Sequence, residues 1–284
     1  MTANWTPDTE GVFAGLHDRT YHAAPGLSHS ASKRMKTPAH YQAYLKEKRD
    51  PSPAMVIGTI THAMILEPLK DLPFTVAPEG LDGRTAAGKA WKAEQVAAGR
   101  EVIAAEDFVA ARSAAESVLS HPTCKQIFEA EGMSELSVFK RFELGGSVMR
   151  KARIDWTPRA GSNALVDIKT TRDASPNAFG KELFEYGYHT GAAWYLDIWN
   201  DANPNDKRDC FVFVAVEKDA PFAVAVYNIS PEAIQLGRRK NIERIQTYIE
   251  CSQSGVWPSY PNDITAIDLP AWAYGKRKSN RFNF

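Results

Sequence analysis

The sequence predicts an α/β protein with a mixed central β-sheet flanked by helices. Its middle third, residues 137–227, contains short runs rich in β-branched and aromatic residues, which are typical of strands. Apolar residues at helical spacing occur before, between and after these runs. Strands surrounded in this way favour one sheet covered by helical layers.

The first two expected strands form a β-hairpin. Residues 137–143 and 148–156 are its arms, and the Gly145-Gly146 pair supplies the turn between them. A turn-rich stretch then leads into the next strand. The remaining strands are expected at 164–170, 211–216 and 222–227.

Helices are expected on either side of these strands. A helix-start signal rich in serine opens the stretch 27–49, and Ser230 is expected to cap a final helix that runs to residue 249. A helix from about 176 to 200 should be interrupted near Gly187 and Gly191. The other helices are expected at 58–66, around Trp91 after a loop in 75–100, and at 105–130.

We expect a single domain over residues 1–284, a length that lies between one large domain and two small ones. It divides into a mainly helical part at about 20–130, a sheet core at about 135–230, and a C-terminal helix and tail at about 230–284. The chain has no internal repeat and no low-complexity tract.

The composition is that of a water-soluble protein with a substantial core, because 44% of the residues are hydrophobic and 24% are charged. No apolar run approaches the ~18 residues of a membrane span, and the N-terminus lacks the features of a signal peptide. Cys124, Cys210 and Cys251 form no C-x-x-C pair, which argues against a zinc ribbon, an iron–sulfur cluster and a disulfide framework. These features predict a cytoplasmic protein without membrane contact.

Charge balance neither identifies nor excludes a nucleic-acid partner. Lys plus Arg and Asp plus Glu both number 34, so the net charge is zero. Non-specific binding to duplex DNA usually uses a basic surface. A chain that buries carboxylates at one place can still gather cations at another.

The strongest chemical signal is a D-x-K pattern. Asp167 and Lys169 are two apart on an expected strand, so they project from the same face. Asp155 lies on the neighbouring strand, where its carboxylate can meet that of Asp167. Convergent carboxylates suit Mg²⁺, and a lysine beside them can activate water and favour a charged phosphate. Taken alone, the tripeptide is more often an exposed ion pair.

His62 is the second candidate. It lies in a G-x-x-x-H pattern on an apolar helix, where a histidine is more often a core residue than a ligand. A neutral imidazole can also complete a metal shell built by Asp155 and Asp167. The small residues at 58, 59 and 61 would allow that helix to approach the sheet closely.

In sequence order, these four residues resemble the metal and catalytic residues of RecB-like PD-(D/E)xK nucleases. The wider sequence resembles the RecE exonuclease domain over about residues 20–230. The similar segments are LSHSASKRMKTPAHY, GTITHAMILEP, GRTAAGKAW, SELSVF, ARIDW, LVDIKTT and YHTGAAWYLD.

The resemblance implies a Mg²⁺ site, in which Mn²⁺ is expected to substitute. The implied metal ligands are His62, Asp155, Asp167 and the backbone carbonyl of Ile168, with Lys169 as the catalytic lysine. Glu135 is implied near the site as a second-shell or second-metal carboxylate, although an acid at a strand start is often only solvated. Tyr195 matches the tyrosine of a Gln-x-x-x-Tyr helix, and Gly191 replaces its glutamine.

Four residues of the early helix are candidates for binding DNA. Lys33 and Arg34 are candidates for gripping a 5′-terminal phosphate, and Ser28 and Ser30 at the helix start would expose backbone N–H groups to an anion. A solvated helix face with a serine cap explains the same residues equally well.

The activity implied by the resemblance is that of a phage-type recombination nuclease. It is a 5′→3′ exodeoxyribonuclease that acts on ends of linear duplex DNA and leaves 3′ tails for a single-strand annealing protein. The resemblance also implies a homo-oligomeric, tetrameric ring in the cytoplasm of a bacterial host. Two alternatives stay open: an endonuclease on the same metal site, and a DNA-binding protein with a weakened site. Gly191, which replaces the glutamine, is the reason for the second alternative.

Overall fold

The structure, a computed structural model, describes residues 5–47, 52–67, 74–159, 161–270 and 274. Its centre is a seven-stranded mixed sheet in the order β1-β5-β6-β7-β8-β9, with β2 paired to β6 off this path. The strands are β1 (Gly11–Phe13), β2 (Leu27–Ser28), β5 (Gly132–Glu143), β6 (Ser147–Pro158), β7 (Ala164–Thr171), β8 (Cys210–Glu217) and β9 (Val224–Asn228).

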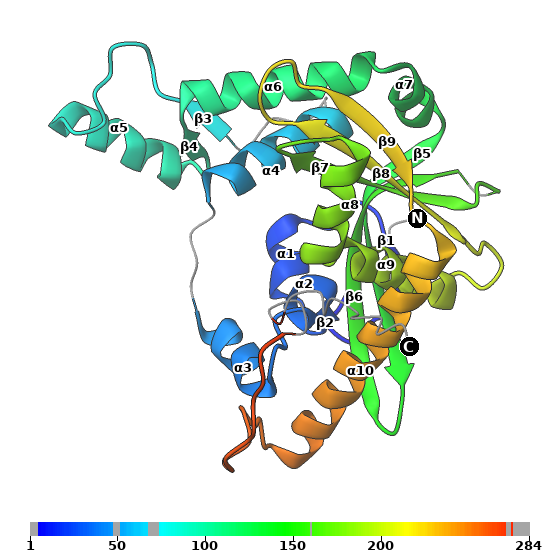
Figure 1. Cartoon of the computed structure of the whole chain (residues 1–284). Coiled ribbons are helices and arrows are strands. Elements are labelled where there is room, and N and C mark those ends of the chain that lie inside the picture. Colours follow the sequence, from blue (N-terminus) through cyan, green and yellow to red (C-terminus); the bar gives the residue numbers. More distant parts are fainter. Residues whose placement is uncertain (1–4, 48–51, 68–73, 160, 271–273, 275–284) are drawn as a thin grey trace, which may run out of the picture.

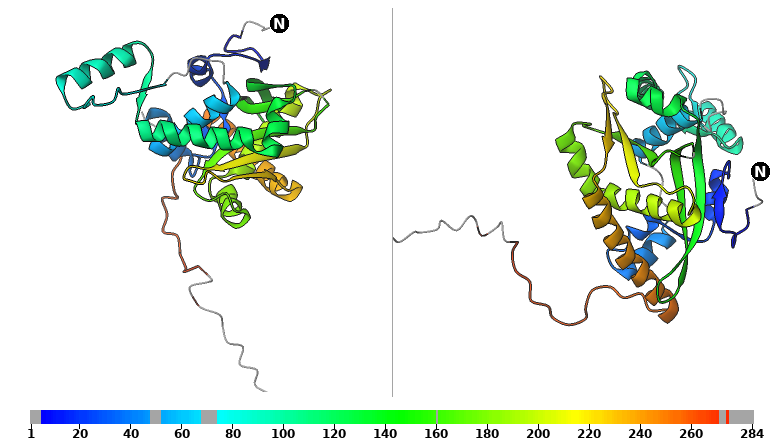
Figure 2. Two further views of the ribbon diagram at one scale, coloured as in Figure 1. Left: turned by 90° about the horizontal axis from the view of Figure 1, so that it is seen from above. Right: turned by 90° about the vertical axis from the view of Figure 1, so that its right-hand side faces the viewer.

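Helices cover both faces of the sheet (Figures 1 and 2). One face packs on α9 (Tyr188–Ala202) and α10 (Pro231–Ser254), and the other on α4 (Pro53–Leu66), α6 (Ala105–Ser120) and α7 (Pro122–Glu129). The predicted fold class, a mixed sheet flanked by helices, is therefore confirmed.

The two-residue period of the strands divides the core into two layers. On β7, Leu165 faces the α9 layer, whereas Val166 and Ile168 face the α4 and α6 layer. On β8, Phe213 faces the α9 layer and Val214 faces the α4 and α6 layer. Strands buried on both faces in this manner read as nearly continuous apolar runs.

β7 and β8 are parallel, while β5–β6, β6–β7 and β8–β9 are antiparallel. The parallel pair needs a crossover, which α8 (Pro176–Glu185) and α9 provide. Gly187 separates the two helices in a left-handed conformation with φ of 69°, so the interruption predicted there is confirmed. The interruption predicted near Gly191 is wrong, because Gly191 lies buried inside α9.

Three other predicted elements differ from the structure. Residues 27–49 form no single helix: β2 is followed by α2 (His29–Ser32) and α3 (Pro38–Lys46), because Pro38 restarts the helix, and residues 48–49 lie outside the described residues. The helix predicted at 105–130 is two helices, since Pro122 starts α7. Phe222, with φ of 57°, precedes β9 and is not part of it.

The N-terminal half also contains elements that were not predicted. β1 and α1 (Asp18–Ala23) precede α2, and a small parallel sheet of β3 (Phe74–Val76) and β4 (Glu101–Ile103) stands apart from the main sheet. Between β3 and β4, α5 (Ala86–Ala97) contains the predicted helix around Trp91. This unit projects from the body (Figure 2).

The final helix agrees with its prediction. The hydroxyl of Ser230 accepts a hydrogen bond from the backbone N–H of Ala233, and Gly255 ends α10 with φ of 70°. Just beyond it, Trp257 stacks on Tyr41 of α3, and the later described residues run away from the body as an extended segment (Figure 2). Within the described ranges, no helix has both the length and the apolar character needed to cross a membrane.

Candidate metal centre

The candidate site lies where β6 and β7 move apart. Among the described residues, the two strands are paired at Trp156 and Val166 alone. Beyond that point, the carboxylate of Asp155 accepts a hydrogen bond of 2.8 Å from the backbone N–H of Ile168. The side chain therefore satisfies a backbone donor that a longer strand ladder would have used. This contact fixes the carboxylate in the fork between the strands.

Helix α4 brings His62 to the same fork. Its Nε2 lies 2.8 Å from the carbonyl oxygen of Ile168, and its Nδ1 lies 3.4 Å from the carboxylate of Asp155. Gly58 permits this approach, since a Cβ there would lie 3.2 Å from the Thr170 hydroxyl on β7. Burial lowers the pKa of His62, although the Asp155 charge opposes the shift. The neutral imidazole is the form that binds metals.

Glu135 on β5 completes a group of three potential ligands. One ligand atom each from His62, Glu135 and Asp155 lies within 4.8 Å of the other two. Glu135 adopts a left-handed conformation with φ of 53°, which is uncommon for a residue with a side chain. Burial and the nearby charge of Asp155 raise the pKa of Glu135 to about 8. The structure thus places Glu135 beside the other candidates.

Asp167 and Lys169 stand next to this group on β7. Their side chains form a close ion pair, and the Lys169 Nζ also lies 3.4 Å from the carbonyl oxygen of Ile168. Burial raises the pKa of Asp167 to about 7, against the effect of the lysine. Burial lowers the pKa of Lys169, but the charges of Asp167 and Asp155 outweigh it and raise the pKa above its ordinary value. The lysine is therefore protonated.

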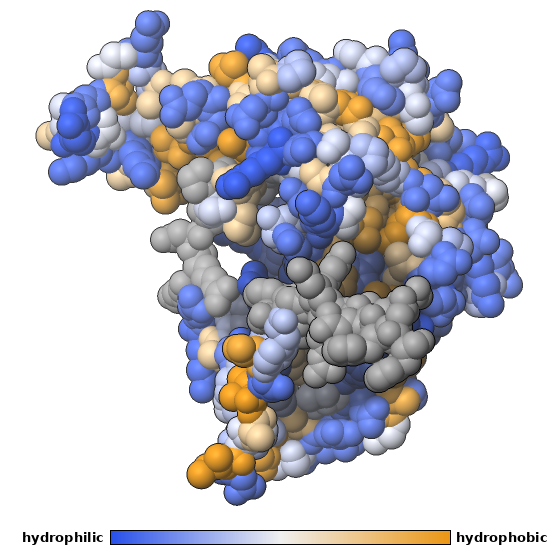
Figure 3. Space-filling model, in the orientation of Figure 1, coloured by the Kyte–Doolittle hydropathy of each residue, from blue (hydrophilic) through white to orange (hydrophobic). Residues whose placement is uncertain are grey.

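The fork between β6 and β7 thus brings together potential metal-binding atoms and a buried ion pair. Oxygen atoms of Asp155, Glu135 and the Ile168 carbonyl lie near one imidazole, and an ammonium group stands beside a buried carboxylate. The space-filling view in Figure 3 shows this side of the molecule hollowed, with many hydrophilic side chains around the hollow.

Residues 28–270 match the family described as PDDEXK-like domain of unknown function (DUF3799). The chain belongs to this family. Membership places it in the PD-(D/E)xK nuclease superfamily, as the motifs indicated, while the narrower RecE-type assignment stays a prediction. None of the curated proteins matches the chain.

One solved structure shares the fold of this DUF3799 member. A crystal structure from Eubacterium rectale, provisionally named an exonuclease, is 13% identical with a TM-score of 0.59, covering 92% of this chain and 98% of that chain. The crystal structure of SSO0001 is 15% identical with a TM-score of 0.30, covering 67% of this chain and 86% of that chain. At these identities the first match shows a shared fold, and the second is too distant to support an inference.

The structure of the DUF3799 domain places Tyr195 in the core beside the site. Its ring lies 6.0 Å from that of Phe211 and 6.4 Å from that of His29, measured between centroids. Burial raises the pKa of Tyr195 well above its ordinary value, and the charge of Asp167 adds to the shift. Tyr195 is therefore a neutral phenol near the carboxylates.

Gly191 faces His29, a residue that the sequence did not single out. A Cβ on Gly191 would lie 3.2 Å from Cε1 and 3.3 Å from Nδ1 of the His29 ring. The ring is held there by a hydrogen bond of 2.7 Å between its Nε2 and the Thr190 hydroxyl. The imidazole thus fills the space beside Gly191, and the glycine serves close packing.

We therefore expect Gly191→Gln to lower the melting temperature and the activity together. The new side chain would displace the His29 ring at a cost of ~1–3 kcal/mol. Gly180→Gln is the matched control, because a Cβ at Gly180 on α8 meets nothing within 4 Å. Thermal unfolding of both variants tests this. A Gly191→Gln variant with unchanged stability and higher activity would show that the glycine is a lost glutamine.

The four residues predicted to bind DNA have different surroundings in the structure. The Ser28 hydroxyl caps α2 by accepting from the backbone N–H of Ala31 at 3.2 Å, and it lies 3.2 Å from the hydroxyl of Ser30. The Arg34 guanidinium lies over the Tyr44 ring, 5.5 Å from its centroid. The two serines thus serve the local cap, and Arg34 is directed toward α3.

Lys33 lies within electrostatic range of Lys169 and of Arg244, a cation that no sequence pattern marks. Its half-buried Nζ donates to the carbonyl oxygen of Tyr186 at 3.2 Å. Burial and the charges of Arg34, Lys169 and Arg244 lower the pKa of Lys33. In the part of the chain that is described, neither Lys33 nor Arg244 has an ion-paired carboxylate. No local motif singles out Arg244, because α10 carries several cations.

Arg244 also borders a groove that continues away from the site. The groove has a volume of about 380 Å³ and lies between the α2–α3 connection and α10. Its lining includes three cations and one carboxylate. The lining residues are Met35, Lys36, Thr37, Pro38, Lys240, Glu243, Arg244 and Thr247.

Proposed function

We propose that this protein is a metal-dependent 5′→3′ exodeoxyribonuclease of the RecE type, which shortens linear duplex DNA from its ends. The observation that carries the proposal is the meeting of His62, Glu135 and Asp155 with the Asp167–Lys169 pair in one fork of the sheet. Carboxylates, an imidazole and an ammonium group in this arrangement suit phosphodiester hydrolysis.

The ligand set fits Mg²⁺, with Mn²⁺ as a substitute. His62, Asp155 and the Ile168 carbonyl would hold the ion, with Asp167 and Glu135 as further carboxylates. The raised pKa values of Asp167 and Glu135 reflect negative groups crowded in a buried place. A divalent cation would relieve this repulsion. The group His62, Glu135 and Asp155 contains no thiolate, which disfavours a zinc site built on cysteines.

We assign to Lys169 the role of stabilising the transition state. When bound, the metal supplies Lewis-acid polarisation of the phosphate and a more acidic water. Because the pKa of Lys169 is raised, its ammonium acts as a hydrogen-bond donor and a positive charge. It would orient the attacking water and favour the extra negative charge on the phosphate. Asp167 holds the ammonium in place through their ion pair.

Lys33 and Arg244 support binding at a DNA end. Both are half-buried, and each acts electrostatically on the same buried His29, as does Lys169. A cluster of cations without a paired carboxylate is costly unless an anion joins it, and a phosphate at the strand end would do so. The basic groove beyond Arg244 would accept the neighbouring backbone. Because these cations gather in one place, DNA binding is compatible with a net charge of zero.

The 5′ polarity, the annealing partner and the tetrameric ring follow from the resemblance to RecE-type domains. They belong to the proposal as its implied context: a recombination nuclease of bacteriophage type in a bacterial cytoplasm, which hands 3′ tails to a single-strand annealing protein. An endonuclease on the same site and a DNA-binding protein with a weakened site are the competing outcomes.

One experiment separates these outcomes. The protein and Mg²⁺ are incubated with a linear duplex with and without a 5′ phosphate, and with a covalently closed circle. We expect the linear DNA to be degraded, the circle to be spared, and a 5′ label to be released before a 3′ label. Binding at Lys33 and Arg244 predicts a preference for the phosphorylated end, which weakens with salt.

The other results assign the protein differently. Cutting of the circle would make it an endonuclease. Binding without cleavage of any of the three substrates, with Mn²⁺ tried as well, would make it a DNA-binding protein. Release of the 3′ label first would keep the nuclease but reverse its polarity.

A further inference from the structure

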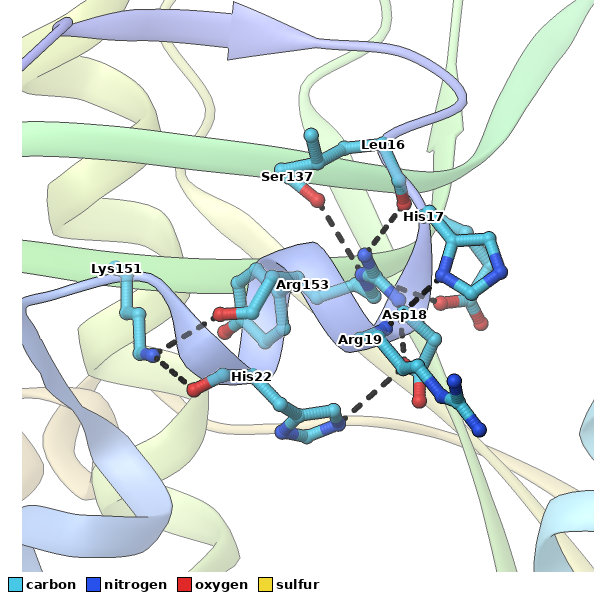
Figure 4. Close-up of polar contacts among 10 residues, drawn as sticks. Leu16, His17, Asp18, Arg19, His22, Ser137, Lys151 and Arg153 are labelled. Atoms are coloured by element: carbon cyan, nitrogen blue, oxygen red, sulfur yellow. Dashed lines mark hydrogen bonds and ion pairs between the residues drawn. The ribbon is translucent and has the colours of Figure 1, made fainter. Parts of the chain in front are cut away.

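Two cations anchor an N-terminal helix on the strand that supplies Asp155. On β6, the side chains of Lys151, Arg153 and Asp155 are two residues apart and share one face of the strand. Helix α1 and the residues before it lie across this face, where Lys151 and Arg153 reach them (Figure 4). An N-terminal segment is therefore docked on the strand that supplies Asp155.

Lys151 serves the end of α1. Its Nζ donates hydrogen bonds to the carbonyl oxygens of Tyr21, His22 and Ala24, at 3.0, 3.2 and 2.7 Å. Carbonyl groups at a helix C-terminus lack partners within the helix, so a lysine there stabilises the docked helix. No contact of Lys151 with the candidate metal ligands is present among the described residues.

Arg153 serves the start of α1. Its guanidinium donates to the carbonyl oxygen of Leu16 at 2.7 Å and to the carboxylate of Asp18 at 2.8 Å. The guanidinium carbon also lies 4.4 Å from the centroid of the Tyr21 ring, a cation–π contact. These three contacts fix the orientation of the side chain.

The same guanidinium reaches the candidate metal centre (Figure 4 shows its contact with Ser137). Its Nε donates to the Ser137 hydroxyl at 3.3 Å and lies 3.8 Å from a carboxylate oxygen of Glu135. Glu135 is the residue with φ of 53°, a conformation that the surrounding structure must hold in place. The charge of Arg153 also opposes the burial and the Asp155 charge that raise the pKa of Glu135.

We infer that Arg153 is a positioning residue that holds the Glu135 carboxylate toward Asp155 and His62, and that residues 16–24 belong to the metal centre through it. The inference rests on the proposed metal-dependent function, because it treats Glu135 as a ligand. Partners of this kind commonly change metal affinity by 10–100-fold when removed.

Mn²⁺ binding to the full chain, measured by titration with electron paramagnetic resonance, tests the inference without relying on activity. We expect Arg153→Met to bind Mn²⁺ at least about tenfold more weakly than the unaltered protein. Lys151→Met is the matched control, because it removes contacts with the end of α1 and leaves the Arg153 contacts with Leu16, Asp18 and Glu135 in place. Both variants should melt at a lower temperature, but Lys151→Met should keep its Mn²⁺ affinity.

Arg153→Lys covers the case in which Arg153→Met fails to fold. A lysine keeps the charge but lacks the planar fork that contacts α1 and β5 at once, so weaker Mn²⁺ binding is again expected. Unchanged affinity in the folded arginine variants would overturn the inference, as would an equal loss in Lys151→Met. Absence of Mn²⁺ binding by the unaltered protein would instead overturn the proposed function.

Discussion

Lys169→Met should lower the rate of DNA cleavage on the order of 10³-fold, the size of effect seen when a group that stabilises charge in the transition state is removed. The ammonium group lies beside Asp167 and the Ile168 carbonyl, in the fork where the phosphate would react. Methionine keeps the length of the side chain and removes the charge. Single-turnover cleavage of a labelled linear duplex measures the loss.

Folding and Mn²⁺ binding should survive this change. Asp167 loses its ion-pair partner, but its pKa is already raised to about 7, so it can take up a proton or pair with a bound cation. The exposed Lys181 on α8 provides the control, and Lys181→Met should cleave at the normal rate. Normal cleavage by Lys169→Met would remove the lysine from the mechanism. A fall in melting temperature comparable to a core truncation would make its role structural.

Asp155→Asn should abolish both Mn²⁺ binding and cleavage. Asp155 is the residue on which the centre converges, because it contacts His62, accepts from the Ile168 N–H and belongs to the ligand group with Glu135. Asparagine retains an oxygen for the Ile168 hydrogen bond, so the variant tests the charge with little change in the strand fork. Anomalous scattering from crystals soaked in Mn²⁺ locates the ion directly.

In the unaltered protein, we expect anomalous density within coordination distance of Asp155 and His62, and none in Asp155→Asn. Glu232→Gln, at an exposed position in the first turn of α10, removes a carboxylate far from the ligands in sequence and should keep the ion. Density that persists in Asp155→Asn would assign the metal to other residues. Absence of density in the unaltered protein would remove the metal-centre proposal itself.

Local interactions along the chain account for the elements that the sequence predicts. The hairpin of β5 and β6, the D-x-K strand β7 and the capped helix α10 depend on turn residues, two-residue alternation and a serine cap, all of which act within a few residues. The same patterns established that Asp167 and Lys169 share a face, since the strand period is fixed.

Motif order also identified most of the candidate ligands. His62, Asp155 and Asp167 carry chemistry that stands out in a family pattern, and the structure brings His62 and Asp155 into contact. Gly191 shows the limit of such matching. The sequence presented it as a missing glutamine and a helix interruption, whereas its neighbour His29, far away in the chain, makes it a packing position.

The features that join distant segments follow from the folded chain and not from local patterns. The fork between β6 and β7, the left-handed Glu135, and the approach of Arg244 and Arg153 to the site each depend on contacts between remote parts of the chain. Cations on a helix or a strand look alike in sequence, because solvated and site-facing lysines and arginines have the same local pattern. Burial beside a particular carboxylate or phosphate site separates them, and burial is a property of the folded chain.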